Sequence, residues 1–257
     1  MATIITTEEE KDIVREGGKR LGLILQVLAS SAKAGVTTKE LDQIAYKLIT
    51  KEGDKPAFLN YTPDGSDRPY PATLCISVNS EVVHGIPGSR VLRDGDIVGL
   101  DLGLSHKGLY VDSAVTVAVG EIDDVSKRLI ETTREALVRG MNVVKAGARI
   151  GDIGEVIERY VKTEGFAIVK ILGGHALGVH PHEEPYIPNY GKRGTGPLLK
   201  EGMLIALEPI VNEGSPKVTL DEKDGYTFHT EDGKRSAHFE HTLLITKDGV
   251  EIVTLVD

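Results

Sequence analysis

The chain has 257 residues, a formal net charge of -9 and a single cysteine, Cys75. A chain of this length can bury most of its apolar surface as one large domain or two merged halves, without a disulfide or a structural metal. Cys75 has no partner for an internal disulfide, which fits a reducing compartment. The acidic balance argues against a nucleic-acid-binding protein, because phosphate contacts need clustered Lys and Arg.

The first residues contain no targeting or membrane segment. Residues 1–11 lack a basic segment followed by an apolar stretch, and the most apolar run, residues 21–29, is interrupted by Gln26 and too short to span a bilayer. We therefore expect a cytoplasmic protein with no membrane and no nucleic acid among its partners. The sequence carries no oligomer pattern, so we expect a monomer.

Two helices are expected at the start of the chain. Thr7 and Glu10 have the spacing of a capping box, and apolar residues then recur at helical intervals, which predicts a helix over residues 7–34. Thr37 opens a second helix that ends at Gly53. Turn-rich sequence follows, with short β-like runs at residues 73–78, 96–102 and 109–119.

The same order of elements then recurs. Helices are expected at about residues 123–145 and 151–164, followed by strands among loops. Residues 33–35 match residues 145–147 in the sequence Lys-Ala-Gly. A second match aligns residues 92–101 with residues 199–208, with similar chemistry at nearly every position. The repeat predicts one fold built from two pseudo-symmetric halves, about 1–122 and 123–257.

Four acidic residues lie in or at the end of apolar strands. The repeat places Asp101 and Glu208 at equivalent ends of equivalent strands, Asp112 lies on the strand after Asp101, and Glu240 lies in another apolar run. A buried carboxylate is costly unless it is paired or bound to a metal. The same strands offer no comparable set of Lys or Arg, which leaves external cations as the compensating charge. The alternative is that each acid simply ends its strand at the solvent.

A further ligand candidate lies in the glycine- and proline-rich loop of residues 172–185. His175, His180 and His182 fall within eight residues of this loop, and its glycines allow the backbone to approach an ion closely. A single histidine is usually structural, but three of them near several acids favour a site. One imidazole with four carboxylates suits Mn, Fe, Co or Zn better than calcium.

The candidates resemble, in order and context, the metal-ligand set of the type I methionine aminopeptidases: Asp101, Asp112, His175, Glu208 and Glu240. This family has the pita-bread fold, which it shares with prolidase, aminopeptidase P and creatinase. The resemblance implies an α+β fold in which a curved antiparallel β-sheet carries helices on its outer face, as a single catalytic domain over residues 1–257. Its most specific pieces are VVHGIP at 82–87, GDI at 95–97, GH at 174–175, HEEP at 182–185, LEP at 207–209 and SAHFEHT at 236–242.

The resemblance also implies the chemistry of the site. Two divalent metal ions (Co, Mn, Fe or Zn) would be bound, with Asp101 and Glu240 bridging them and a shared water acidified enough to supply hydroxide. Glu208 would be both a ligand and a proton shuttle. His182 and His84 would be catalytic residues that hydrogen-bond the substrate, near its carbonyl oxygen and its scissile nitrogen respectively.

Three further residues fall where the family lines its methionine pocket: Tyr70, Cys75 and Tyr226. Together they offer apolar and soft sulfur surface suited to a thioether. For each of them the alternative is core packing, most strongly for Cys75, which lies on an expected strand.

The sequence departs from the usual family pattern at two places near the site. Pro181 precedes His182 where an aromatic residue is common, and residues 176–177 are Ala-Leu instead of the more frequent glycine-isoleucine. The pocket shape is therefore less tightly implied than metal binding. The remaining histidines are not assigned to metal, and surface or core roles are expected for them: His106, His180, His229, His238 and His241.

The function implied by the resemblance is removal of the initiator methionine from peptides or nascent chains whose second residue is small. A transient contact with the ribosome is left open. One alternative is an Xaa-Pro peptidase of the same fold, although those enzymes usually carry a large extra N-terminal domain. The other is a non-catalytic binding module on this fold, although such modules typically lose ligands and all five are present here.

Overall fold

The structure is a computed structural model that describes residues 2–63 and 68–256. Within these ranges no helix is long and apolar enough to cross a membrane. The elements in chain order are α1 (Glu8–Ser31), α2 (Thr38–Lys51), β1 (Lys55–Pro56), β2 (Cys75–Val78), β3 (Glu81–Val83), β4 (Ile97–His106), β5 (Leu109–Ala118), α3 (Asp124–Met141), α4 (Ile150–Thr163), β6 (Ala167–Ile168), β7 (Gly174–Leu177), β8 (Glu183–Ile187), β9 (Leu204–Leu207), β10 (Ile210–Asn212), β11 (Val218–Leu220), β12 (Phe228–Thr230), β13 (Ser236–His238), β14 (Glu240–Ile245) and β15 (Val250–Ile252).

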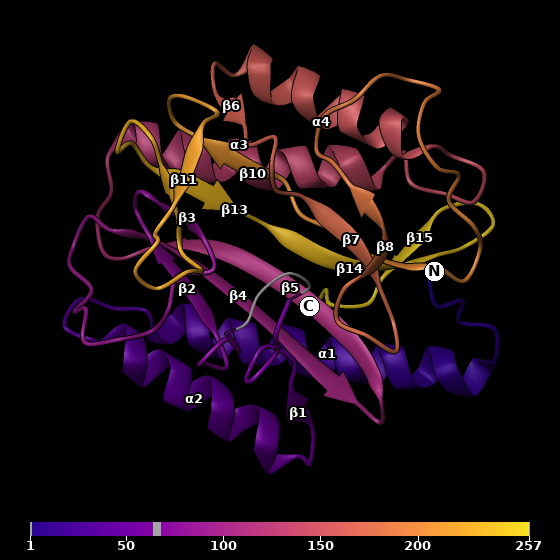
Figure 1. Cartoon of the computed structure of the whole chain (residues 1–257), viewed down its shortest axis with the longest axis horizontal. Coiled ribbons are helices and arrows are strands. Elements are labelled where there is room, and N and C mark those ends of the chain that lie inside the picture. Colours follow the sequence, from indigo (N-terminus) through magenta and orange to yellow (C-terminus); the bar gives the residue numbers. More distant parts are fainter. Residues whose placement is uncertain (1, 64–67, 257) are drawn as a thin grey trace.

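A nine-stranded sheet runs through the centre of the molecule (Figure 1). Its main strand order is β1-β4-β5-β14-β9-β7-β8, and β2 and β15 pair with β4 and β14. All of these pairs are antiparallel. In Figure 1, α1 and α2 lie along one flank of the sheet and α3 and α4 along the other. The neighbouring central strands β5 and β14 come from distant parts of the chain, so the sheet joins its early and late segments.

The first two helices begin at the capping boxes that the sequence predicts. The Glu10 N–H donates to the Thr7 hydroxyl at 3.2 Å, and the Thr7 N–H donates to the Glu10 carboxylate at 2.9 Å. Thr37 and Glu40 repeat both bonds at the start of α2. Each box satisfies backbone N–H groups that have no partner within the helix, which fixes where the helix begins.

The third helix is shorter than the sequence predicts. It ends at Met141, not near residue 145, and Asn142 is its C-terminal cap, with an N–H that bonds back to carbonyl groups of the last turn. Val143 and Val144 continue the apolar pattern, but they follow in short turns and pack against the core from outside the helix. Their side chains are apolar because they are buried. Periodicity alone cannot distinguish such a buried segment outside a helix from a continuation of the helix.

The turn between β4 and β5 is also shorter than predicted. β4 runs on to His106, and only Lys107 and Gly108 form the turn, with φ of 48° and 91°. A two-residue turn with positive φ at both positions matches the natural twist of antiparallel strands, which allows the strands to stay paired up to the turn.

The two halves of the chain make the same backbone connections at equivalent places. In each half, the N–H of the glycine after the first helix of the pair donates to the residue that opens the repeated strand segment, and the N–H of that residue donates to the residue after the glycine. These contacts support the proposed division into halves at 1–122 and 123–257. The equivalent N–H to carbonyl pairs are Gly35 to Leu92 and Gly147 to Leu199, Leu92 to Val36 and Leu199 to Ala148, and Gly95 to Val119 and Gly202 to Ile245.

Apolar side chains cover the outer face of the sheet. Leu100, Leu102 and Leu104 of β4 are fully buried in a cluster with residues of α1 and α2. A second cluster lies where α3 and α4 pack on the sheet, and it contains Ile205 and Leu243. Because side chains alternate along a strand, the residues between these leucines point to the opposite, inner face.

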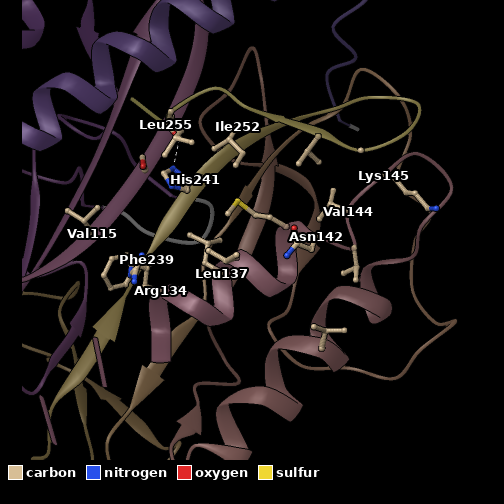
Figure 2. A pocket seen from close by; sticks show the side chains of 18 of the residues that line it. Val115, Arg134, Leu137, Asn142, Val144, Lys145, Phe239, His241, Ile252 and Leu255 are labelled. Carbon is tan, nitrogen blue, oxygen red and sulfur yellow. Dashed lines mark hydrogen bonds between the residues drawn. The ribbon is translucent and has the colours of Figure 1, made fainter. Parts of the chain in front are cut away.

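A groove of about 1500 Å³ lies on this outer face between α1 and α3 (Figure 2). Val115, Phe239 and His241 point into it, and Nδ1 of His241 lies 2.9 Å from the Thr254 hydroxyl. Glu240, between two of these residues, points to the inner face. Among the described residues, the groove contains no cluster of His, Cys, Asp or Glu with metal-binding spacing. The group that does have this spacing, Asp112, His175 and Glu240, lies on the other face of the sheet.

Helix α1 passes close to the C-terminal segment at Gly18. A Cβ added there would lie 2.2 Å from the backbone oxygen of Val253, so one of the two backbones would have to move. We predict that Gly18→Ala lowers the free energy of unfolding by about 1–3 kcal/mol, as measured by denaturant unfolding followed by circular dichroism. Lys19→Ala, an exposed neighbour, is the control and should change it by less than about 0.5 kcal/mol. If both variants changed the free energy of unfolding equally and by a small amount, the tight contact between Gly18 and Val253 would be contradicted.

Candidate metal centre and substrate cavity

Strand pairing places the predicted ligands in two adjacent rows on the inner face of the sheet. In the first row His175 pairs with Ala206, and Ala206 pairs with Thr242. The Thr242 hydroxyl accepts a hydrogen bond from the Asp112 N–H at 2.8 Å, which extends the row to β5.

The second row runs from β2 to the end of β9. Cys75 pairs with Asp101, Asp101 with Ala114, and Ala114 with Glu240. Glu208 directly follows β9, where the register with β14 places it beside Glu240. Acids from both halves of the chain therefore meet on one face, next to the first row.

Asp101 and Asp112 are not direct cross-strand partners. Asp101 lies opposite Ala114, and Asp112 lies opposite Gly103, so the two acids share a face but are offset by two residues along the hairpin. Gly103 also leaves room for the neighbouring loop, since a Cβ there would lie 3.0 Å from the Phe58 ring. The offset puts Asp112, on the central strand, diagonally between the acids of β4 and β14.

The residues selected from the sequence line one cavity of about 330 Å³, a size suited to a small ligand. The cavity lies on the inner face, and both rows contribute to it. The structure thus brings together all ten predicted site residues: Tyr70, Cys75, His84, Asp101, Asp112, His175, His182, Glu208, Tyr226 and Glu240.

The donor atoms lie close enough to share an ion. Ligand atoms of Asp112, His175 and Glu240 lie within 4.8 Å of one another. Nε2 of His175 lies 3.8 Å from Oε1 of Glu208. These separations allow a cation between the side chains to contact several of them at once.

Burial and mutual repulsion raise the pKa of three carboxyl groups. Burial, together with the charge of Glu208, raises the pKa of Asp112 to about 7. Burial and the neighbouring carboxylates also raise the pKa values of Asp101 and Glu240 well above their ordinary range. Like charges in a poorly solvated cavity disfavour ionisation. The centre therefore needs either protons or cations to compensate its acids.

Glu208 behaves differently from the other three acids. Burial acts to raise its pKa, but the His238 imidazole nearby and the positive charge that His238, His175 and His84 can carry outweigh this effect. As a result the pKa of Glu208 is lowered. Glu208 is thus the acid of the group that ionises most readily.

Unpaired oxygen atoms in the cavity wall fit a cation site. Oδ1 of Asp101, Oδ1 of Asp112 and Oε1 of Glu240 are buried and have no hydrogen-bond partner among the described residues. Buried polar atoms in folded proteins nearly always have a partner, so three such oxygens in one place indicate a ligand that supplies it.

The orientation of His175 fits the same ligand. Its Nδ1 lies 3.0 Å from the backbone oxygen of Ala176, a contact that favours the proton on Nδ1. The lone pair of Nε2 is then available on the side of Glu208. One imidazole with four carboxylates is a donor set for divalent ions of intermediate hardness.

The two predicted substrate-binding histidines approach the centre from loops. His84 follows β3 with φ of 59°, a conformation uncommon for residues other than glycine. Burial lowers its pKa to about 4, although Glu208 opposes this, so the ring is neutral near pH 7. His182 lines the cavity yet is exposed, which places it at the opening. Its ring centroid lies 4.3 Å from that of His175 and 5.1 Å from that of Tyr61.

The far end of the cavity is apolar. Tyr70, Cys75 and Tyr226 are buried in one hydrophobic cluster, and the two tyrosine rings meet edge to face with centroids 5.1 Å apart. The Tyr70 hydroxyl donates to the Gly85 backbone oxygen at 2.9 Å. Burial raises the pKa of the Cys75 thiol, which keeps it neutral. These residues therefore serve both as core and as cavity wall.

Sequence reasoning missed four residues of this region. Phe58, Tyr61 and Pro63 line the cavity from a turn-rich loop, where no periodic pattern assigns side chains to a face. His238 lies with Nε2 3.4 Å from Oε2 of Glu208. Its position two residues before Glu240 could have indicated the same face of the strand, because strand side chains alternate.

A curved antiparallel sheet with helices on its outer face and a carboxylate-rich centre on its inner face defines the class, a metal-dependent hydrolase. The chain belongs to metallopeptidase family M24, whose sequence pattern it matches over residues 12–247. Use of divalent metal follows from this membership. The pita-bread fold expected from the sequence is confirmed.

Individual relatives agree with this assignment. The chain is 46% identical to methionine aminopeptidase 1 of Bacillus subtilis over 254 residues, 98% of this chain and 99% of that protein. A crystal structure of methionine aminopeptidase from Rickettsia prowazekii is similar with a TM-score of 0.94 at 39% identity, covering 99% of this chain and 100% of the other. An Xaa-Pro dipeptidase from Bacillus anthracis shares the fold, with a TM-score of 0.78 at 22% identity, but this chain covers 62% of it.

Proposed function

We propose that this chain is a methionine aminopeptidase, which uses divalent metal to remove the N-terminal methionine from peptides and nascent proteins with a small second residue. The observation that carries the proposal is one cavity with four acids and a histidine in its sheet wall and an apolar end beside them. The full-length relatives that bear this name support it.

Two ions of Co, Mn, Fe or Zn would be held by the two rows of ligands. The close grouping of Asp112, His175 and Glu240 supports one ion there, with Glu208 beside His175. Asp101, in the second row, supports a second ion. Asp101 and Asp112 lie diagonally across the hairpin on the face that also carries Glu240, so these three acids would hold the two ions together.

Bound divalent ions would supply Lewis-acid polarisation and an acidified water. Glu208 is the residue suited to accept the proton and deliver it to the leaving amine, because its pKa is the lowered one among the four acids. His182, at the cavity opening, would donate to the substrate carbonyl oxygen. The neutral His84 would contact the scissile nitrogen.

The apolar end of the cavity would bind the methionine side chain. Tyr70 and Tyr226 line it with rings that meet each other edge to face, and Phe58 belongs to the same cluster. A thioether gains favourable contacts with aromatic rings and with the soft sulfur of Cys75. We further propose that the protein works as a monomer in the cytoplasm, with nascent-chain N-termini as its partners and a transient contact with the ribosome.

Peptide specificity tests this function against its alternatives. With Mn, Fe or Co bound, we predict that kcat/KM for Met-Ala-Ser exceeds that for Xaa-Pro peptides by about 100-fold, because a fitted side-chain pocket supplies differences of this order. Released amino acids would be measured by chromatography, and a chelator should abolish release. Faster cleavage of Xaa-Pro would establish the other enzyme, and tight binding of two ions without methionine release would establish a binding module.

A further inference from the structure

His238, the last residue of β13, is a buried imidazole beside the acidic centre, outside the set of residues that line the cavity. Only 4% of its surface is exposed. Its backbone is fixed on two sides: it pairs with Ile210 of β10, and the Thr116 hydroxyl accepts from its N–H at 2.9 Å and donates to its carbonyl at 2.8 Å. The backbone that carries the ring is therefore held in place.

Two acids of the centre face the His238 ring. Its Nε2 lies 3.4 Å from Oε2 of Glu208 and 4.0 Å from Oε2 of Glu240, and it has no hydrogen-bond partner in the part of the chain that the structure describes. Good N–H···O bonds measure about 2.7–3.2 Å, so a shift of roughly 0.2 Å would make one to Glu208. A buried N–H left without an acceptor costs about 1–3 kcal/mol, which favours that shift.

The two oxygens of Glu208 face different partners. Oε2 faces His238, whereas Oε1 lies 3.8 Å from Nε2 of His175, the predicted ligand nitrogen. A carboxylate held through one oxygen has its rotation restricted, and the other oxygen then keeps a fixed direction. The side toward which Oε1 is held is the side where Asp112, His175 and Glu240 gather.

We propose that His238 is a positioning residue for the metal centre: its Nε2–H donates to Oε2 of Glu208 and holds Oε1 toward the position of the metal. This inference rests on the proposed metal site. Hydrogen-bond partners of ligands of this kind change metal affinity by about 10–100-fold when they are removed. The His238 ring would act on metal affinity through Glu208 and would not touch the substrate, since the ring does not line the cavity.

Metal affinity in matched variants tests the proposal. His238→Leu keeps the volume but removes the donor, and His238→Gln can restore a donor through its amide. His241→Leu is the control, because it removes an imidazole three residues further along the chain, in β14, where the ring points into the groove on the outer face. Each protein would be stripped with a chelator, checked for folding by its thermal transition, and titrated with Mn or Co by calorimetry.

We expect His238→Leu to weaken binding of the tighter ion by about 10–100-fold, with binding largely restored in His238→Gln and unchanged in His241→Leu. Wild-type affinity in a folded His238→Leu would overturn the proposal. So would equal losses in the leucine and glutamine variants, because a hydrogen-bond donor would then not be the relevant property.

A second measurement does not depend on the variants folding. In ¹⁵N-labelled metal-free wild type, long-range proton–nitrogen spectra of the histidine rings should show His238 with its proton on Nε2, as donation requires. A proton on Nδ1 would overturn the proposal. If wild type bound no divalent ion at all, the proposed function would fail, a result distinct from either of these outcomes.

Discussion

Replacing Glu208 with glutamine should lower kcat for Met-Ala-Ser by about 10²–10⁴-fold, the range that a positioned acid–base group contributes. Glutamine keeps the size of the side chain and one oxygen that can reach a cation, but it cannot take up a proton. Steady-state rates at saturating metal would be compared with the metal content of the same samples, so that loss of ions is separated from loss of proton transfer.

The control for this substitution is Glu201→Gln, which removes one negative charge from an exposed position shortly before β9. We expect its kcat to equal that of wild type. A Glu208→Gln enzyme with its full complement of ions and a kcat within about threefold of wild type, a barrier change of under 1 kcal/mol, would assign proton transfer to another group.

Chelator-stripped protein should lose stability as the pH rises from 6.5 to 8. Burial and the neighbouring acids raise the pKa of Asp112 to about 7 and those of Asp101 and Glu240 well above their ordinary range, so the folded chain retains protons on these acids at higher pH than the unfolded chain does. In the unfolded chain the same groups are already ionised. The unfolded state therefore binds fewer protons, and each such group lowers the free energy of unfolding by up to about 1.4 kcal/mol per pH unit.

The buried histidines act in the opposite direction at the lower end of this range. Burial lowers the pKa values of His84 and His241 to about 4 and that of His182 to about 3, so the unfolded state binds more protons on these rings, an effect that fades as the pH rises above 6.5, their ordinary value. Denaturant unfolding at several pH values, with and without Mn, would measure the effect. The bound ion should reverse it, since cations favour ionised acids.

Substitution identifies an acid that is responsible for part of the pH dependence of the free energy of unfolding. Asp112→Asn should reduce the pH dependence of the stripped protein, whereas Asp248→Asn, at an exposed position, should leave it unchanged. A stripped wild type whose stability is constant between pH 6.5 and 8 would show that the acids are compensated by something other than protons.

Much of the fold and the centre could be predicted because a few residues conflict with their surroundings. Glu240 lies in an apolar strand, where an acid is costly, and Glu208 ends another such strand. Thr7 and Glu10 carry the capping pattern that starts α1, and it forms as expected. Local chemistry of this kind can be read along the chain, since it does not depend on what lies across the sheet.

The remaining features depend on contacts between distant segments. The offset between Asp101 and Asp112 is set by the two-residue turn, and turn length shifts register by whole residues. The proposed role of His238 depends on its contact with Glu208, thirty residues earlier, and this contact depends on how β10 and β13 pair. Phe58 and Tyr61 reach the cavity from a loop, whose path no pattern in the sequence specifies.

The ligand rows have a consequence for how the enzyme acquires its cations during synthesis. Asp101 and Asp112 belong to the early part of the chain, but Glu240 joins them from β14, after almost all other strands. A growing chain that has exposed only its first hairpin offers two acids, and the full donor set assembles when β14 inserts beside β5. The metal ions should therefore bind late, only after β14 has joined the sheet.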